Sequence, residues 1–281
     1  MNGGRIKPGF RPKKALGQHF LVDQGIIEKI ISNSGFQASD LVLEIGPGQG
    51  ALTLPLARLA GQVIAVEKDA QLIPLLKKKL SRERISNVIL INKDILKWDF
   101  REMGLSPSSK LKVIGNLPYN ISTPFLEKLI ENRGSVSRAV LMFQLEIAER
   151  LTASPGNRIY GALTVLVQYH AHATRLLAVS RNAFYPKPKV DSMVLELDFE
   201  RHHPNSVVDE VSFRKVVKGA FAHRRKTLLN SLKDVYSFLD RELILEGLIK
   251  CGIDPVRRAE TLNIDEFLCL ASALELTKGQ N

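Results

Sequence analysis

The sequence contains only two cysteines among its 281 residues. Cys251 and Cys269 are too few for a disulfide framework, and their spacing matches no metal-binding motif. Four histidines form two close pairs that lack a third ligand at a suitable spacing, namely His170 with His172 and His202 with His203. We therefore expect no metal site, and the scarcity of cysteine favours a reducing, cytoplasmic location.

Long apolar runs are also missing, because none approaches the length needed to cross a membrane. The first 14 residues are polar and basic without a hydrophobic stretch, so we expect no secretory signal there. With 44% hydrophobic and 25% charged residues, the composition is typical of a soluble globular protein without membrane association. The length suffices for one large domain and one small domain.

Acidic residues are absent from two basic segments of a chain whose net charge is +11. Residues 1–22 and residues 213–233 each carry at least five lysines and arginines and no acid. One-sign clusters of this kind are typical of phosphate-binding surfaces, although a basic enzyme without such a role would share the charge. The side chains that we expect to contact nucleic acid are Lys13, Lys14, Arg224, Arg225 and Lys226.

Apolar strand patterns alternate with helical ones over the first half of the chain. Strands are expected at residues 41–45, 62–66, 88–91, 111–114 and 138–143, and helices at 51–59, 70–80 and 124–132. This alternation predicts a doubly wound, mostly parallel sheet. Helices at 145–151 and 161–171 and a terminal antiparallel strand pair at 173–179 and 190–199 complete that domain.

A polar linker at residues 201–206 marks the expected domain boundary. Apolar residues recur at helical spacing beyond it, which predicts a small all-α domain. The predicted organisation is a basic N-terminal arm at 1–22, a Rossmann-like α/β domain at 23–204 and a helical domain at 205–281. We found no internal repeat.

A glycine-rich turn follows the first long strand at residues 46–50. Glycine permits tight turns and close approach of a ligand to the backbone. Glu67 ends the next strand, 21 residues after Gly46, where a carboxylate can accept both ribose hydroxyls. Because Gly46, Gly48 and Ala51 also satisfy G-x-G-x-x-G/A, a nicotinamide dinucleotide remains a competing ligand.

Three features favour S-adenosylmethionine over a dinucleotide. The loop continues as G-x-G-x-G behind the acidic Glu44. Asp94 follows the third strand, where it can accept the adenine amine, although a surface turn residue would look the same. The fourth strand ends in a motif suited to nitrogen methylation and lacks a hydride-transfer arrangement.

That motif runs from Val113 to Ser122 and contains Asn-Leu-Pro-Tyr. The strand is expected to break at Gly115, and a helix to open with a Ser122 hydroxyl cap and a proline in its first turn. An Asn116 side-chain oxygen and a backbone carbonyl can accept both N–H groups of an exocyclic amine, while Tyr119 stacks on the base. The motif resembles that of amino-methyltransferases, although an ordinary strand–turn–helix junction uses similar residues.

Five ordered segments, at residues 14–23, 42–53, 115–122, 184–192 and 223–230, together resemble the KsgA-type small-subunit (16S) rRNA adenine dimethyltransferases. The resemblance spans nearly the whole chain from Lys13. It implies cofactor contacts at His19, Leu21, Gly46, Glu67, Asp94 and Asn116. Many family members carry Asn where this chain has His19, so we expect that contact to use the backbone. The resemblance implies a catalytic set of Asn116, Leu117, Tyr119 and Phe184, with the two aromatic rings clamping the target base.

The implied reaction is metal-free dimethylation of the 6-amino groups of two adjacent adenosines in a hairpin loop near the 3′ end of small-subunit rRNA. The family acts within a nearly assembled small-subunit (30S) particle, and we expect a monomer. Three alternatives remain open at this point. They are a large-subunit rRNA dimethyltransferase of the resistance type, a non-catalytic assembly factor that keeps the fold, and a nicotinamide dehydrogenase.

Overall fold

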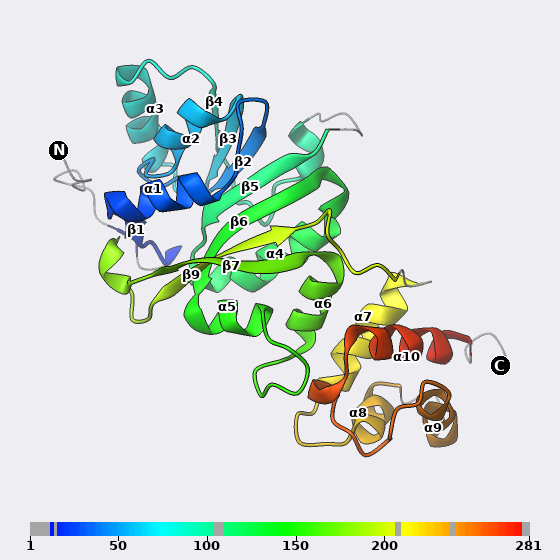
Figure 1. The fold of residues 1–281 in the computed structure, drawn as a ribbon. Helices are drawn as coiled ribbons and strands as arrows, with labels where there is room; N and C mark the ends of the chain where they lie inside the picture. The colour runs from blue at the N-terminus through cyan, green and yellow to red at the C-terminus, as the bar shows by residue number, and fades with distance from the viewer. Residues whose placement is uncertain (1–11, 14–15, 104–108, 206–208, 237–239, 277–281) are drawn as a thin grey trace. The chain divides into compact units, whose positions relative to one another are not determined.

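A seven-stranded sheet forms the centre of the first of two units into which the chain divides (Figure 1). The computed structural model describes residues 12–13, 16–103, 109–205, 209–236 and 240–276. The first unit comprises residues 1–148 and 172–201, and the second comprises 149–171 and 202–281. Within the described residues, no helix is both long and apolar enough to cross a membrane.

The strands of the large sheet lie in the order β4-β3-β2-β5-β6-β9-β7. Their bounds are β2 (Leu41–Ile45), β3 (Gln62–Glu67), β4 (Val88–Asn92), β5 (Leu111–Asn116), β6 (Val136–Gln144), β7 (His172–Val179) and β9 (Ser192–Asp198). The first five strands of this order are mutually parallel, and β9 pairs antiparallel with both β6 and β7. The prediction of a mostly parallel sheet that ends in an antiparallel pair is confirmed.

Strand β5 extends further than its sequence indicates. It was expected to end at Ile114 and to break at Gly115, but Gly115 pairs with Leu141 and Asn116 with Met142 of β6. A Cβ atom at Gly115 would lie 3.0 Å from the Ile45 carbonyl oxygen, so glycine here permits close approach of β2. The extension places Asn116 at the carboxyl end of a central strand.

Four helices accompany the strands of the first unit: α1 (Gln24–Asn33), α2 (Thr53–Leu59), α3 (Leu72–Arg82) and α4 (Ser122–Glu131). Asp23 caps α1, because its carboxylate accepts the Ile26 N–H at 3.0 Å. The predicted Ser122 cap is wrong. A 3₁₀ turn at Tyr119–Ile121 leads directly into α4, so Ser122 lies within the first helical turn. Its buried hydroxyl has no hydrogen-bond partner among the described residues.

A separate two-stranded sheet joins β1 (Phe20–Leu21) to β8 (Phe184–Tyr185) in antiparallel pairing. The N–H groups of Val22 and Asp23 also donate to the Ala183 carbonyl, at 2.9 and 3.3 Å. The end of the predicted N-terminal arm is therefore attached to the segment that precedes β9.

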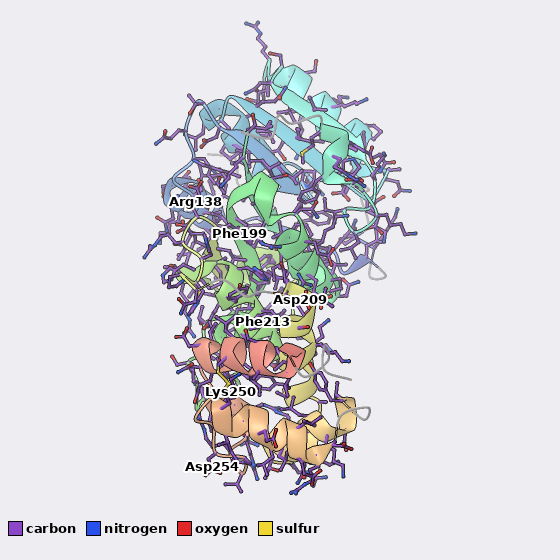
Figure 2. All side chains as sticks on the ribbon, turned by 90° about the vertical axis from the view of Figure 1, so that its right-hand side faces the viewer. Arg138, Phe199, Asp209, Phe213, Lys250 and Asp254 are labelled. Carbon is purple, nitrogen blue, oxygen red and sulfur yellow. A yellow bond between two sulfur atoms is a disulfide. The ribbon has the colours of Figure 1, made fainter. Side chains whose placement is uncertain are left out.

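The second unit is helical. It contains α6 (Ala162–His170), α7 (Glu210–Ala220), α8 (Leu228–Val235), α9 (Arg241–Lys250) and α10 (Ile264–Leu276), while α5 (Leu145–Leu151) spans the first boundary between units. Asp209 caps α7 through the Val211 and Ser212 N–H groups, and Phe213 on the same helix is fully buried (Figure 2). Cys251 and Cys269 form a disulfide. Further 3₁₀ helices among the described residues are at Phe100–Met103, Arg133–Ser135, Arg181–Ala183 and Ala259–Thr261.

Residues 149–171 were predicted to belong to the α/β domain, but their contacts assign them to the helical unit. The Tyr169 and Phe213 rings pack with centroids 4.6 Å apart, and the His203 N–H donates to the Tyr169 carbonyl at 3.1 Å. Gly156 N–H donates to the Glu260 carbonyl at 2.7 Å. The second boundary, after residue 201, lies near the predicted one after residue 204.

Candidate cofactor and active site

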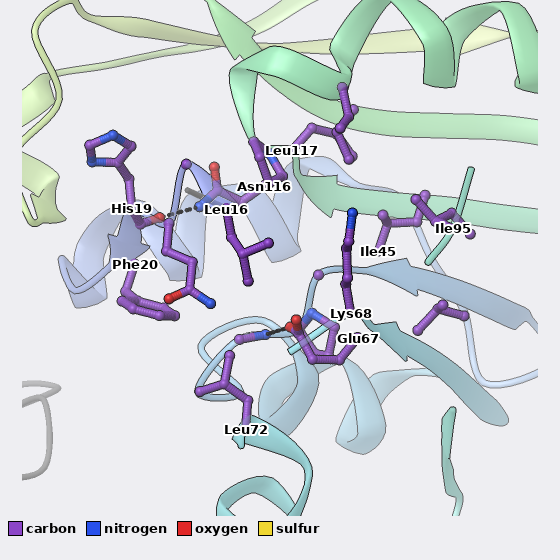
Figure 3. A pocket seen from close by; sticks show the side chains of 18 of the residues that line it. Leu16, His19, Phe20, Ile45, Glu67, Lys68, Leu72, Ile95, Asn116 and Leu117 are labelled. Carbon is purple, nitrogen blue, oxygen red and sulfur yellow. Dashed lines mark hydrogen bonds between the residues drawn. The ribbon is translucent and has the colours of Figure 1, made fainter. Parts of the chain in front are cut away.

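A pocket opens at the carboxyl ends of β2, β3 and β5 and is covered on one side by residues 16–21 (Figure 3). The parallel strands direct their C-terminal residues to this edge, which is where open α/β sheets bind ligands. Eight of the nine predicted cofactor and catalytic residues line the pocket: His19, Leu21, Gly46, Glu67, Asp94, Asn116, Leu117 and Tyr119. Phe184 is the ninth and does not line it.

The glycine turn after β2 leaves room at the pocket wall. Gly46 and Gly48 adopt left-handed conformations with φ of 63° and 58°. A Cβ atom at Gly46 would meet nothing within 4 Å, whereas one at Gly48 would lie 3.1 Å from the Phe20 ring. Gly46 therefore borders open space that a ligand can enter, and Gly48 permits close packing of Phe20.

Glu67 lies at the end of β3 with both carboxylate oxygens engaged by main chain. Gly48 N–H donates to Oε2 at 3.0 Å and Asp69 N–H donates to Oε1 at 2.8 Å. Burial raises the pKa of Glu67, and these hydrogen bonds oppose that rise. Because each carboxylate oxygen has two lone pairs, Glu67 retains acceptor capacity for ligand hydroxyls at the pocket wall.

Asp94 lies beyond β4, and Lys68 from the turn after β3 forms an ion pair with it at 2.8 Å. Burial acts to raise the pKa of Asp94, but hydrogen bonds from Lys68 and the Leu96 N–H lower it below its usual value. No sequence motif indicated the role of Lys68. The pair leaves an ionised acceptor at the pocket edge, which suits an exocyclic amine.

Asn116 is oriented by a main-chain contact. Its Nδ2 donates to the His19 carbonyl oxygen at 2.9 Å, and this bond is drawn in Figure 3. The nitrogen therefore faces residues 16–21, and no described residue donates a hydrogen bond to the Oδ1 atom, which can accept one from a ligand. The His19 ring points away from the pocket centre in the same view, and its Nδ1 lies 2.7 Å from the Pro186 carbonyl oxygen.

Tyr119 and Phe184 occupy different surroundings. Tyr119 is half-buried at the pocket, its hydroxyl lies 3.0 Å from Ser192 Oγ, and its ring stacks beside His19 with centroids 5.9 Å apart. Burial raises the pKa of the Tyr119 hydroxyl. Phe184 is only 4% exposed and packs in the apolar core with Leu21. The structure therefore does not bring the two predicted clamp rings together at the pocket.

Glu44 is a buried acid at the pocket wall that the sequence indicated only as the residue before the glycine turn. Burial raises its pKa to about 8, and the neighbouring Glu67 charge adds to the rise. Its Oε2 has no hydrogen-bond partner within the described part of the chain. A buried oxygen without a partner can form a hydrogen bond with a ligand that reaches it.

These features fit S-adenosylmethionine better than a dinucleotide. Glu44, Glu67 and Asp94 place three carboxyl groups around the pocket, which suits a ligand with hydroxyls, amines and a cationic sulfur. A pyrophosphate needs N–H donors at the glycine turn. The Gly48 N–H already donates to Glu67, and the adjacent acids disfavour a second anion.

A further acid, Asp69, was missed by sequence reasoning because no motif marks it. It is 3% exposed and joins the turn after β3 to Lys13 and Gln18. Lys13, predicted to bind RNA, thus forms an ion pair at 2.7 Å within the protein. Lys14 lies outside the described residues.

The other predicted RNA contacts lie in the second unit, between α7 and α8. Arg224 donates to the Arg158 carbonyl at 2.6 Å, and Lys226 forms an ion pair with Asp234 at 2.6 Å. Arg225 is exposed between them. Arg225 is therefore the member of this group whose removal disturbs the fewest internal contacts.

The chain is similar to known proteins over nearly its whole length. The family described as ribosomal RNA adenine dimethylase matches residues 9–275. A relative from Desulforapulum autotrophicum, named ribosomal RNA small subunit methyltransferase A, is 48% identical over 93% of this chain and 92% of the relative. A relative of the same name from Geobacter metallireducens is 44% identical over 97% and 98% of the two chains.

Two solved structures are similar in fold and sequence. A dimethyladenosine transferase from Plasmodium falciparum aligns with a TM-score of 0.78 and 31% identity, covering 92% of this chain and 98% of that one. The 23S rRNA methyltransferase ErmE aligns with a TM-score of 0.68 and 26% identity, covering 91% and 99%. Both likenesses extend through the α/β unit into the helical unit.

Proposed function

The chain belongs to the ribosomal RNA adenine dimethylase family, and from this premise we propose that it dimethylates the 6-amino groups of two adjacent adenosines in a hairpin loop near the 3′ end of small-subunit rRNA. Family membership makes it an S-adenosylmethionine-dependent rRNA adenine dimethyltransferase. Full-length relatives named for the small subunit, at 44–48% identity, favour that substrate over the large-subunit rRNA of ErmE, at 26%.

The observation that carries the proposal is the orientation of Asn116. The lone pair of an adenine amino group is delocalised into the ring, which makes the nitrogen a poor nucleophile. Asn116 Oδ1 can accept one amino N–H because its amide nitrogen is held by the His19 carbonyl. Leu117 also lines the pocket, and its main-chain carbonyl would be the second acceptor. Two accepted hydrogen bonds make the nitrogen more tetrahedral and direct its lone pair into the pocket.

S-adenosylmethionine supplies a methyl group already activated on a sulfonium, so the protein contributes mainly position and electrostatics. Glu67 and Asp94 would hold the ribose and adenine of the cofactor, and Gly46 would leave space for its methionine portion. Asn116 would hold the substrate nitrogen in line with the transferred carbon.

The target base must leave its stack to enter the pocket, and an unpaired loop nucleotide does so at least cost. The half-buried ring of Tyr119 is the stacking face in this proposal. Stacking on an aromatic ring is worth about 1–3 kcal/mol per base. A stacking role for Phe184 would require its ring to leave the core, so the proposal does not depend on it.

We further infer that the substrate is rRNA within a 30S precursor and that the enzyme acts as a cytoplasmic monomer. The exposed Arg225 supports phosphate contact outside the pocket. Glu67, Asn116 and residues 16–21 all come from one chain, which supports catalysis without a second copy.

Transfer of labelled methyl groups to undermethylated small ribosomal subunits tests the proposal, with free rRNA and large subunits as parallel substrates. We expect incorporation into small subunits at two adjacent adenosines. Incorporation into large subunits alone would assign the resistance-type activity instead. Binding to small subunits without any methyl transfer would indicate a non-catalytic assembly factor.

The variant Asn116→Ala should lower the rate of methyl transfer by a factor on the order of 100 or more, similar to the loss of one positioned catalytic dipole. A matched control is Asn132→Ala, which also removes an amide that donates to a main-chain carbonyl, at 2.8 Å, but lies outside this pocket. Near wild-type turnover by Asn116→Ala would refute the alignment of the amine by this side chain.

A further inference from the structure

Residues 16–21, here called the strap, cover the pocket and are attached at both ends. All six residues line the pocket. The C-terminal end of the strap pairs with β8, where Phe20 opposes Tyr185 and Leu21 opposes Phe184. The other end is held through side chains that converge on Asp69, and this attachment has no counterpart in the motifs of the sequence.

Asp69 accepts hydrogen bonds on both carboxylate oxygens. Oδ1 accepts from Lys13 Nζ at 2.7 Å and from the Gln71 N–H at 3.1 Å. Oδ2 accepts from Gln18 Nε2 at 2.9 Å, and Gln18 Oε1 in turn accepts the Lys13 N–H at 2.8 Å. Together with the Lys13 main-chain N–H, the three side chains form a closed ring in which each donor faces an acceptor.

The contacts of Asp69 come mostly from the strap and from Lys13, which precedes it. A buried carboxylate is costly unless it is paired and hydrogen-bonded. Two of its partners come from the N-terminal segment, namely the Lys13 cation and the Gln18 amide of the strap. The turn after β3, to which Asp69 belongs, supplies only the Gln71 N–H. Burial raises the pKa of Asp69, but the bonds from Lys13 and Gln18 lower it below its usual value. With the strap released, water would have to replace both partners.

Asp69 is also linked to Glu67 and to Asn116. The Asp69 main-chain N–H donates to Glu67 Oε1 at 2.8 Å, so Asp69 and the residue proposed to bind the ribose belong to one turn. Gln18 immediately precedes His19, whose carbonyl holds the Asn116 amide at 2.9 Å. A displacement of Gln18 would therefore be passed through one peptide to the contact that orients Asn116.

We propose that Asp69 is a positioning residue that locks the strap over bound S-adenosylmethionine and keeps the His19 carbonyl against Asn116. The lock sets the residence time of the cofactor, because the strap must leave Asp69 before the product cofactor escapes past it. The part of the inference that concerns Asn116 rests on the proposed function. The part that concerns cofactor binding does not require RNA.

The test is Asp69→Asn in the full-length protein, with binding of S-adenosylhomocysteine measured by calorimetry in the absence of RNA. The substitution keeps the shape but removes the anion that pairs with Lys13. Hydrogen bonds to a charged group are among the strongest in proteins, so we expect the dissociation constant to rise roughly 10- to 100-fold, mainly through faster dissociation.

The matched control is Asp40→Asn. The Asp40 carboxylate also forms an ion pair with a lysine, Lys112, at 2.7 Å and accepts a hydrogen bond from the Gln37 main-chain N–H. Asp40 does not line the pocket. This variant should bind S-adenosylhomocysteine with wild-type affinity. An equal loss of affinity in both variants would overturn the proposal, as would wild-type affinity in Asp69→Asn.

A readout that a purely structural role would not change is amide hydrogen exchange of residues 16–22. Saturating S-adenosylhomocysteine should slow this exchange in the wild type and in Asp40→Asn, and much less in Asp69→Asn. If Asp69→Asn fails to fold, Lys13→Met provides the same test, because Lys13 is 40% exposed and its removal leaves no cavity in the core. Unchanged affinity and exchange in Lys13→Met would then refute the lock.

A double-mutant cycle identifies the partner. If Asp69 acts through Lys13, the combination Lys13→Met/Asp69→Asn should weaken binding about as much as Asp69→Asn alone, whereas independent effects would multiply. The outcomes also separate this proposal from the proposed function. If Asp69→Asn loses cofactor affinity and even the wild-type protein methylates no RNA, the lock stands and the proposed function is refuted. If Asp69→Asn binds cofactor and methylates RNA normally, the lock is refuted and the proposed function stands.

Discussion

The substitution Gly46→Ala separates the backbone requirement of the glycine turn from its role in holding a ligand. Gly46 has φ of 63° and borders open space, so an added Cβ meets no protein atom within 4 Å. An alanine there incurs the cost of a left-handed conformation, about 1–2 kcal/mol of unfolding free energy. Its methyl group also enters the space that the cofactor would occupy.

Gly35 provides the matched control because it has the same φ of 63° and lies in the same unit. A Cβ atom at Gly35 would approach the Arg138 Nη1 atom at 2.9 Å, which is the far end of a flexible side chain that can move. Both alanine variants should therefore lose about 1–2 kcal/mol of unfolding free energy and melt a few degrees lower than the wild type.

Only Gly46→Ala should weaken binding of the cofactor. Forcing one extra methyl group into a well-packed contact costs typically 1–3 kcal/mol, which corresponds to about a 5- to 150-fold weaker affinity. Calorimetric titration with S-adenosylhomocysteine measures the affinity, and scanning fluorimetry measures the melting temperature. Wild-type affinity in Gly46→Ala would show that the ligand does not approach this turn. Equal loss of affinity in Gly35→Ala would show that strain alone explains the effect.

The remaining predictions concern charge. The folded protein keeps a proton on Glu44 until about pH 8, whereas the unfolded chain releases it near 4.5, so this residue makes stability fall as pH rises between those values. Glu44→Gln should flatten that decline in melting temperature measured from pH 5 to 9, and an unchanged slope would refute the assignment. Arg225→Ala should weaken RNA binding and lower the slope of log K against log salt by about 1, with cofactor affinity unchanged. In Arg224→Ala, which also loses a bond to the Arg158 carbonyl, part of any effect should appear as reduced stability. Filter binding at several salt concentrations distinguishes these outcomes, and identical salt slopes for wild type and Arg225→Ala would exclude a phosphate contact.

Residues whose role depends on main-chain geometry at strand ends were predictable from the sequence. Apolar runs bounded by turn residues predicted the positions of the strands. Because the carboxyl ends of parallel strands meet at one edge of a sheet, Gly46, Glu67, Asp94 and Asn116 were expected to lie close together. The structure lines one pocket with all four.

Long-range side-chain contacts were not predictable in the same way. The pairing of Lys13 with Asp69 joins residues 56 positions apart, and no periodicity records such a contact. Lys13 was therefore interpreted only as part of a basic cluster. The sequence around Phe184 does not distinguish a buried ring from one that stacks on a base. The assignment of residues 149–171 to the helical unit depends on tertiary packing against α7, which the sequence does not record.

The contact between Asn116 and residue 19 uses a carbonyl oxygen that every amino acid possesses. The side chain at position 19 is therefore not needed to orient the Asn116 amide. The imidazole of His19 leaves this contact undisturbed, and its Nδ1 lies 2.7 Å from the Pro186 carbonyl oxygen. Sequence variation at this position is thus compatible with unchanged chemistry, and substitutions there should be tolerated as long as the main chain keeps its path.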